Sequence, residues 1–413
     1  MRDAQALLRS LFEGAVQAAT PANCMSKWLP RRPPGDAVVI GAGKAAAAMA
    51  FEIERQWGSP LRGAVVVPRG HEVHCDHVSV ITAAHPMPDK NSIVASKRLL
   101  AEVGGLSEND TVLCLLSGGG SALMTLPLPG VSLDDLQQLT QRLLHSGAAI
   151  HEINCVRKKL SAIKGGKLAL ACAPARVVTL IISDVPGNDV AVVASGPTVA
   201  DTTSVADAIA ILDRYGIEVE QRLISAMRSG DTQAVGRIDA DVRVLATSDD
   251  ALQAAALAAM ELDVTPCVLG DLAGDARDLA REHASLALDI AAGNGPLEPP
   301  CVILSGGETT LTVTGDGRGG RNGEYSLALA IALDGHPQIS ALACDTDGID
   351  GSGDNAGCFV LPDTLRRARE MSVDAQQCQG SNDSYRFFAE TGSLLKTGPT
   401  LTNVNDFRAI LIQ

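Results

Sequence analysis

The sequence predicts an α/β protein of two α/β domains with mainly parallel sheets, and three observations support this. Short apolar runs that end in glycine, serine, aspartate or proline recur along the chain. Alanine- and leucine-rich stretches of helical character follow them, and this alternation is typical of parallel strands covered by helices. The 413 residues exceed the usual size of one compact core, so two domains are expected.

The polar and irregular span 214–241 separates two series of these runs, and a new series begins at Val242. We therefore expect one domain over residues 1–240 and a second over residues 241–413. In open α/β sheets, ligands bind beyond the carboxyl ends of the strands, so functional residues should follow the runs. The expected strands are residues 37–40, 64–67, 111–116, 177–182, 242–246, 301–304 and 339–343.

Composition limits the partners of this protein. The net charge is −14, which argues against binding to nucleic acid or to an anionic membrane, because both depend on clustered Lys and Arg. Glu13 interrupts any signal-like apolar run near the N-terminus, and no stretch of about 18 apolar residues occurs. Ten cysteines are scattered without metal-ligand spacing. We expect a cytoplasmic protein with buried, reduced cysteines.

The first glycine-rich turn, residues 41–46, follows a strand and opens an alanine-rich helix. Its backbone N–H groups could hold an anion, so Gly41 and Gly43 are candidates for phosphate binding. Lys44 is unusual here, because the helix dipole disfavours an ammonium group unless an anion offsets it; the alternative is a solvated lysine. The turn also resembles a dinucleotide fingerprint, but the next strand ends at Arg69 and not at an acid.

The second turn, residues 116–123, places three consecutive glycines after an apolar strand. Glycines allow positive φ angles and a close approach of the backbone to a phosphate, whereas a merely tight turn rarely needs three. We assign nucleotide or phosphate binding to Ser117, Gly118, Gly119, Gly120 and Ser121.

Two further glycine-rich turns lie in the second half of the chain, at residues 305–310 and 317–324. We assign phosphate binding to Gly306, Gly307 and Glu308 of the first. The second carries two arginines, Arg318 and Arg321, and arginine at such a turn suits phosphate or carboxylate recognition.

The sequence contains no Gly-x4-Gly-Lys-Ser/Thr element and no His-Arg-Asp or Asp-Phe-Gly motif. The P-loop and protein-kinase architectures are therefore excluded. A kinase built on this chain would be of another type.

Acidic residues follow two of the expected strands, at residues 183–189 and 344–354. Such carboxylates suit Mg²⁺, which prefers oxygen ligands, and we take Asp184, Asp189 and Asp347 as candidates. The alternative is that several of these acids only cap helices or turns. The second segment lacks the glutamate of a calcium loop, so an EF-hand is rejected.

The remaining polar segments are residues 85–89 and the basic stretch 154–167. His85, Arg157 and Lys164 are candidates for binding a substrate carboxylate or nucleotide phosphates. The alternative for the basic stretch is a solvated helical face, which charge runs usually form.

In this order, the motifs resemble the glycerate 2-kinase family of the MOFRL type, whose members are often labelled hydroxypyruvate reductases. The resemblance runs from about Ala37 to the C-terminus. The chain departs from the family pattern at Lys159, Asn188 and Ser393. The segments that carry it are residues 41–46, 85–89, 117–123, 154–167, 183–189, 194–198, 317–324, 346–351, 382–385 and 397–406.

The resemblance implies a Rossmann-like N-terminal domain, a MOFRL-type C-terminal domain and an active site in the interdomain cleft. It implies that Lys44 and an arginine of the segment 317–324 are catalytic, with Arg318 and Arg321 both open. We take Asn322 of the same segment as a further substrate-binding candidate.

The activity implied is ATP-dependent and Mg²⁺-dependent transfer of the γ-phosphoryl group to the 2-hydroxyl of D-glycerate, giving 2-phosphoglycerate. Glycerate and ATP are then the partners, and a homodimer is the assembly considered. Two other classes stay open: an NAD(P)H-dependent hydroxypyruvate reductase, and a non-catalytic regulator that binds a sugar acid or nucleotide.

Overall fold

The computed structural model describes residues 3–58, 61–230, 238 and 240–413. The chain divides into two compact units, residues 24–245 and residues 1–23 with 246–413, which we call the N-terminal and the C-terminal unit. This division differs from the expected one at residue 240 because helix α1 (Ala4–Ala19) belongs with the C-terminal unit. The helix packs along α11 (Ser248–Glu261), and the Phe12 ring lies 5.9 Å from that of Phe407.

The N-terminal unit is built on a six-stranded sheet in the order β3-β2-β1-β4-β5-β6. The pairs from β3 to β5 are parallel, as expected from the strand-helix alternation. The order reverses between β1 and β4, and such switch points are where doubly wound sheets bind ligands. The strands are β1 Ala37–Ala42, β2 Arg62–Pro68, β3 Val78–Ala83, β4 Thr111–Leu116, β5 Arg176–Ile182 and β6 Ala240–Ala246.

Helices of the N-terminal unit form two groups. One group packs on the sheet, and the other, made of α6, α7, α9 and α10, has a hydrophobic core of its own around Leu143, Val156 and Leu212. Ser132 and Ser204 cap α6 and α9 through capping boxes. The elements are α2 Pro21–Cys24, α3 Ala46–Trp57, α4 Lys90–Glu102, α5 Gly120–Leu123, α6 Leu133–His145, α7 Ile150–Lys159, α8 Lys167–Cys172, the 3₁₀ turns Pro186–Asn188 and Val193–Ser195, α9 Val205–Arg214 and α10 Gln221–Ser229.

The C-terminal unit has a mixed six-stranded sheet in the order β13-β12-β11-β14-β9-β7. Only the pairing of β7 with β9 is parallel, so the parallel order expected for this half is not found. The reason is that β14 enters antiparallel between β9 and β11, which still run in one direction with β7. The strands are β7 Thr265–Asp271, β9 Cys301–Gly306, β11 Ile339–Asp345, β12 Gly357–Val360, β13 Leu394–Leu395 and β14 Asp406–Ile412, and a separate pair is β8 Gly274–Asp275 with β10 Thr309–Thr310.

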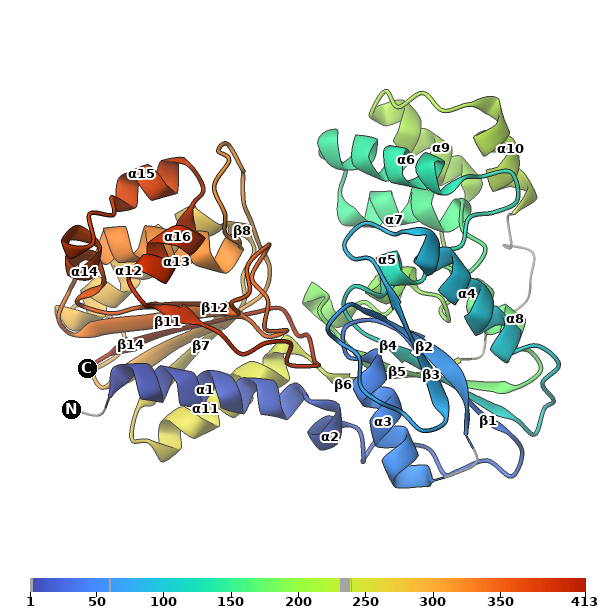
Figure 1. Cartoon of the computed structure of the whole chain (residues 1–413), viewed down its shortest axis with the longest axis horizontal. Coiled ribbons are helices and arrows are strands. Elements are labelled where there is room, and N and C mark those ends of the chain that lie inside the picture. The colour runs from blue at the N-terminus through green and yellow to red at the C-terminus, as the bar shows by residue number, and fades with distance from the viewer. Residues whose placement is uncertain (1–2, 59–60, 231–237, 239) are drawn as a thin grey trace. The chain divides into compact units, whose positions relative to one another are not determined.

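Helices cover both faces of this second sheet, with α1 and α11 on one face and α12 and α13 on the other (Figure 1). The core on the α12 and α13 side is rich in alanine, leucine and isoleucine, and Phe387 and Phe388 close it. The helices not yet given are α12 Ala276–Ala291, α13 Arg321–Leu333, α14 Thr364–Glu370, α15 Ala375–Gly380 and α16 Ser384–Glu390.

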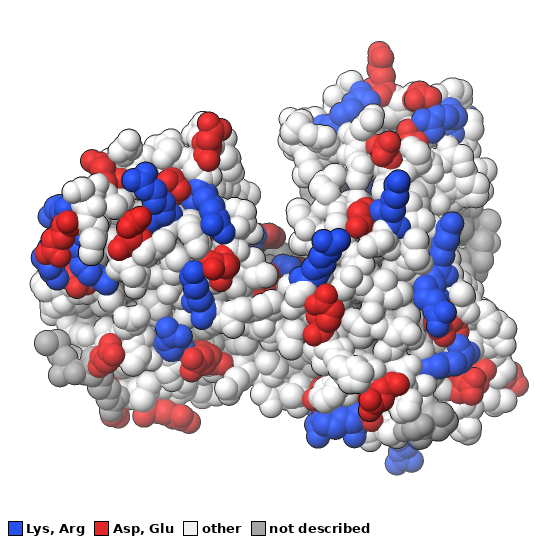
Figure 2. Space-filling model, viewed as in Figure 1, with Lys and Arg blue, Asp and Glu red and all other residues white. Residues whose placement is uncertain are grey.

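Two expectations from composition can be compared with the structure. All ten cysteines are free thiols, and Cys114, Cys301 and Cys344 are buried in strands as expected. Among the described residues, no helix combines the length and the apolar character that a membrane span needs. Figure 2 shows Lys and Arg side chains interspersed with Asp and Glu over the visible face of each unit. An anionic substrate therefore depends on a local cluster of cations.

Candidate active site

The first and second glycine-rich turns lie side by side at the switch point of the N-terminal sheet, because β1 and β4 are neighbours there. The backbone N–H of Lys44 donates to Gly118 O at 2.9 Å, and that of Ala45 donates to Ser117 Oγ at 2.9 Å. The two turns thus form one structure, which holds the Lys44 side chain at the carboxyl end of β1.

The glycines of the first turn are explained by close packing. A Cβ at Gly41 would lie 2.2 Å from Leu115 O, and one at Gly43 would lie 2.2 Å from Ser117 Oγ. The N–H of Gly43 donates to Val66 O, so the N–H groups of residues 43, 44 and 45 all have partners within the protein. The backbone N–H groups that are expected to bind a phosphate at this turn therefore already donate to acceptors within the protein.

The second turn differs in its backbone hydrogen bonds. The backbone N–H groups of Gly118 and Gly119 donate to none of the described residues, although Gly118 is buried. Gly119 has a φ of 82°, a left-handed conformation that suits glycine, and the His85 ring lies against it, 3.0 Å from where a Cβ would stand. Adjacent unpaired N–H groups next to a left-handed residue make an anion-binding concavity.

A cluster of cations adjoins this turn. The buried Lys164 ammonium donates to the carbonyl of Ser121 and, at 2.8 Å, to Ser121 Oγ. Burial, together with the charge of Arg157, holds the pKa of Lys164 well below its usual value. Arg157 is partly buried, burial lowers its pKa, and among the described residues it has no hydrogen-bond or ion-pair partner. Two like charges without a carboxylate partner favour the binding of an anion.

The acids of segment 183–189 follow β5, which neighbours β4. Asp184 is partly buried, whereas Asp189 is exposed and accepts a hydrogen bond from Ala191 N at 2.9 Å. In the part of the chain that the structure describes, no group of three or more His, Cys, Asp or Glu side chains is placed to hold a metal ion. The third metal candidate, Asp347, is buried after β11 in the C-terminal unit, where it accepts from Ile349 N at 2.8 Å.

Arg321 is the centre of the polar edge of the C-terminal sheet. Its guanidinium donates to Asp406 at 2.8 Å, to Asp345 at 3.0 Å and to Glu308 at 2.6 Å. Burial works against its charge, but the carboxylates outweigh burial and raise the pKa of Arg321. The strand register explains the cluster, because Asp345 at the end of β11 pairs with Asp406 at the start of β14.

Asp350 fixes the start of helix α13, which carries Arg321 and Asn322. Its carboxylate accepts from Asn322 N at 3.0 Å and from Gly323 N at 2.8 Å, and burial raises its pKa to about 6. A Cβ at Gly320 would lie 2.3 Å from Asp350 Oδ1, so this glycine gives the carboxylate access to the helix N-terminus. Asn322 Nδ2 donates to Asp406 Oδ1 at 2.7 Å.

The other predicted residues of the C-terminal unit have different surroundings. Arg318 is exposed, and its guanidinium lies 4.2 Å from the centroid of the Tyr385 ring. Gly306 and Gly307 are packed against residues 271 and 272, where a Cβ would meet Asp271 Oδ1 at 2.7 Å and Leu272 O at 2.3 Å respectively. Glu308, for which we predict phosphate binding, pairs with Arg321.

Sequence reasoning missed several polar residues. Asp350, Asp406, Asn154 and Ser195 lie in segments that carry the family resemblance, and Asp345 lies in the acidic segment 344–354. The sequence assigns none of these five side chains an individual role. Of the three departures, Lys159 is buried and pairs with Asp201 at 3.0 Å, Ser393 accepts from Arg367 at 3.2 Å, and Asn188 has a left-handed φ of 56°. The first two are therefore structural contacts.

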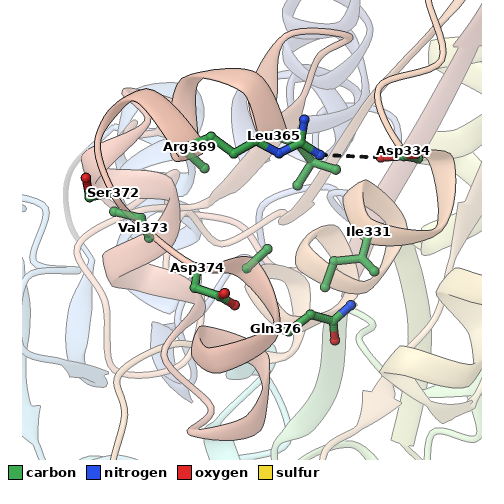
Figure 3. A pocket seen from close by; sticks show the side chains of 10 residues that line it. Ile331, Asp334, Leu365, Arg369, Ser372, Val373, Asp374 and Gln376 are labelled. Atoms are coloured by element: carbon green, nitrogen blue, oxygen red, sulfur yellow. Dashed lines mark ion pairs between the residues drawn. The ribbon is translucent and has the colours of Figure 1, made fainter.

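A hollow of about 490 Å³ lies on the C-terminal unit between α13, α14 and α15 (Figure 3). Arg369 and Asp334 pair across it at 3.7 Å. None of the predicted site residues lines it. This hollow is therefore distinct from both polar clusters described above.

Comparison with known proteins adds the family. A model described as the MOFRL family matches residues 301–406, and one described as a domain of unknown function, DUF4147, matches residues 7–228. The chain is 48% identical, over 99% of its length and 94% of the relative's, to an Agrobacterium vitis protein named provisionally as a hydroxypyruvate reductase. It is 39% identical to a D-glycerate 2-kinase of Thermotoga maritima, over 96% and 95% of the two chains.

The crystal structure of a glycerate kinase from Thermotoga maritima matches 99% of both chains with a TM-score of 0.89 and 38% identity. This likeness confirms the two-domain α/β fold class. The order of the motifs and the matches over nearly the whole chain indicate the same family. The chain therefore belongs to the glycerate 2-kinase family of the MOFRL type.

Proposed function

We propose that this protein is an ATP-dependent glycerate 2-kinase, which transfers the γ-phosphoryl group of ATP to the 2-hydroxyl of D-glycerate. The whole-length similarity to glycerate kinases supports the reaction class. The observation that supports it within this chain is a cluster of hydrogen-bond donors at the switch point, several of which have no partner among the described residues. There the N–H groups of Gly118 and Gly119 adjoin the cations Arg157 and Lys164. ATP and glycerate are both anions, and these groups fit anions.

Within this proposal, Lys44 and the second turn bind phosphate oxygens, because the first turn has no free N–H groups from residue 43 to residue 45. Arg157 and Lys164 bind the carboxylate of glycerate, for which the planar guanidinium of Arg157 offers two parallel donors. His85, against Gly119, adds a third polar group. Each role is one of positioning and charge neutralisation, which phosphoryl transfer mainly requires.

Arg318 and Arg321 are the candidates for stabilising the transferring phosphoryl group. Arg318 is exposed, whereas Arg321 shares its charge among three carboxylates. To bind a phosphate oxygen, Arg321 must give up its hydrogen bond to one of these carboxylates. Glu308 is the partner suited to such an exchange, because it is exposed while Asp345 and Asp406 are buried.

ATP is expected to arrive with Mg²⁺, which neutralises phosphate charge when bound. Phosphate oxygens and waters complete most of its shell, so one or two carboxylates suffice as protein ligands. Asp184 fits this requirement, since it follows the strand beside the second turn, and Asp189 and Asp347 are the other candidates. We assign no step of the reaction to the ion.

The test is ADP release from ATP and Mg²⁺ with and without D-glycerate, compared for the wild type and Lys44→Ala. We expect glycerate-dependent ADP release, 2-phosphoglycerate as the product by ³¹P NMR, and at least about a hundredfold loss in the variant, since charge-stabilising groups contribute on this scale. NAD(P)H oxidation is followed in parallel with hydroxypyruvate, the activity named for the Agrobacterium vitis relative. NAD(P)H oxidation without ADP release would overturn the kinase proposal.

A further inference from the structure

The hydroxyl of Ser121 belongs to a chain of four polar side chains with a defined direction. Ser195 Oγ donates to Asn154 Oδ1 at 3.1 Å. Because a hydroxyl has only one proton, Ser195 must accept in its 2.8 Å contact with Ser121, and Ser121 must donate. At its other side, Ser121 Oγ accepts from Lys164 Nζ at 2.8 Å. The proton of Ser121 is therefore donated to Ser195, and the Ser121 oxygen keeps one lone pair that can accept a further hydrogen bond.

This direction decides what Ser121 can bind. An ionised phosphate oxygen only accepts hydrogen bonds, so it needs a donor that Ser121 no longer offers. An alcohol can donate its proton to the remaining lone pair. The Ser121 oxygen therefore suits a ligand hydroxyl group better than a phosphate oxygen, the ligand that the glycine-rich turn suggested.

The groups beside Ser121 complete the recognition. Lys164 Nζ donates to both the carbonyl and the hydroxyl of Ser121, and Arg157 donates to none of the described residues. Asn154 and Arg157 lie three residues apart on α7 and so share a face of that helix. Cations that bind a carboxylate therefore stand next to a hydroxyl acceptor.

We propose that Ser121 is the specificity-determining residue that accepts the hydroxyl on the carbon next to the carboxylate, with Ser195 and Asn154 as its positioning residues. The proposal rests on the proposed glycerate 2-kinase function and names how the 2-hydroxyl is distinguished from the 3-hydroxyl. In an α-hydroxy acid the hydroxyl and the carboxylate are on adjacent carbons. This spacing matches the site, where the acceptor Ser121 is hydrogen-bonded to Lys164, one of the carboxylate-binding residues.

One of the two positioning residues, Ser195, lies in a strained backbone segment. Ala194 and Ser195 have φ values of 50° and 62°, in the left-handed region that non-glycine residues rarely adopt. The segment is held on two sides: Gly165 N donates to Ser195 O at 3.1 Å, and Ala194 packs so closely on Gly120 that a Cβ there would lie 2.9 Å away. Strain of this kind persists where the surroundings fix it, and it is often found at functional sites.

The experiment measures the binding of three carboxylates without ATP by titration calorimetry: D-lactate, which has only the α-hydroxyl, 3-hydroxypropionate, which has only the β-hydroxyl, and propionate, which has neither. One hydrogen bond to a group that itself contacts a charged side chain corresponds to roughly a tenfold change in affinity. The wild type should therefore bind D-lactate about tenfold more tightly than 3-hydroxypropionate.

In Ser195→Ala and Asn154→Ala the contacts that fix the orientation of the Ser121 hydroxyl are lost, so its acceptor lone pair is no longer held toward the ligand. The ratio should then fall to within about threefold while the affinity for propionate stays unchanged. The matched control is Ser96→Ala, which removes a buried hydroxyl on α4 and should keep the wild-type ratio. Melting temperatures identify a variant that does not fold. The proposal is then tested by the affinity ratio of the other variant, compared with the ratio of the wild type.

A wild type without preference for D-lactate, or folded variants that keep the ratio, would overturn the proposal. Failure of the kinase function is a separate result, because glycerate-dependent ADP release is then absent while the D-lactate preference and its loss in Ser195→Ala persist. A propionate affinity that falls together with that of D-lactate assigns Ser195 a merely structural role and also refutes the proposal.

Discussion

The strongest test of the coupled glycine-rich turns is Ser117→Ala. The Ser117 hydroxyl is fully buried and accepts the N–H of Ala45 at 2.9 Å, at the beginning of α3. Removing the oxygen leaves this N–H buried without a partner, because Ala45 is also fully buried. The cost of a buried unsatisfied donor is about 1–3 kcal/mol.

For a unit of this size, each kcal/mol lowers the melting temperature by about 2–4 °C, so the shift should be about 2–12 °C. Differential scanning calorimetry measures it on the transition of the N-terminal unit. The control is Ser225→Ala, which removes an exposed helical hydroxyl that donates to Gln221 O, and surface changes of this kind stay within about 0.5 kcal/mol.

The same variant should raise the KM for ATP, because the Ala45 contact helps to hold Lys44 against the second turn. Steady-state kinetics well below the melting temperature separate this effect from unfolding. A Ser117→Ala protein that melts with the wild type and keeps its KM would refute the idea that the two turns act as one structure.

Three further predictions concern the C-terminal unit. Arg277→Met removes the cation of Glu324, which is fully buried and paired with Arg277 at 2.6 Å. The free energy of unfolding, measured in urea, should fall by about 3–5 kcal/mol, and a fall below about 1 kcal/mol would contradict the prediction. The pKa of Asp350 is raised to about 6, so the folded state holds this proton more tightly than the unfolded state, and stability from this group rises as pH falls from about 6 to 4. The wild type should therefore gain stability relative to Asp350→Asn over that window in urea titrations, and a flat difference refutes the assignment. Arg321→Ala should lower both the melting temperature and the kcat of ADP release, because it removes the cation that Asp345, Asp406 and Glu308 share. The exposed Arg318→Ala should leave the melting temperature unchanged, and equal losses in the two variants would be inconsistent with the ion pairs described.

Much of the N-terminal fold follows from sequence because its signals are local. Each expected strand in residues 37–182 is present, since a short apolar run bounded by glycine or proline leaves few alternatives. The direction of the C-terminal strands could not be obtained in this way. Strand β14 pairs with β9 and β11 from more than sixty residues away, and nothing in residues 406–412 records that partner choice.

The candidate site could be predicted only in part. Lys44, which follows β1, and Arg157 and Lys164 of the basic stretch could be proposed because their residue types stand out in an acidic chain. Asp350 and Ser195 could not, because their contacts cross long sequence distances. An aspartate that caps another segment's helix looks, in sequence, like any aspartate in a turn.

Two glycine-rich turns that look alike in sequence differ in their hydrogen bonds, and this difference determines their chemistry. In the first, glycine is needed because Leu115 O and Ser117 Oγ occupy the space of a side chain, and the N–H groups of residues 43–45 are already bonded. In the second, the N–H groups of Gly118 and Gly119 have no partner among the described residues. A phosphate can therefore bind the second turn without breaking any internal hydrogen bond, whereas at the first it would have to displace several. A dinucleotide pyrophosphate, which depends on the backbone of the first turn, is correspondingly disfavoured.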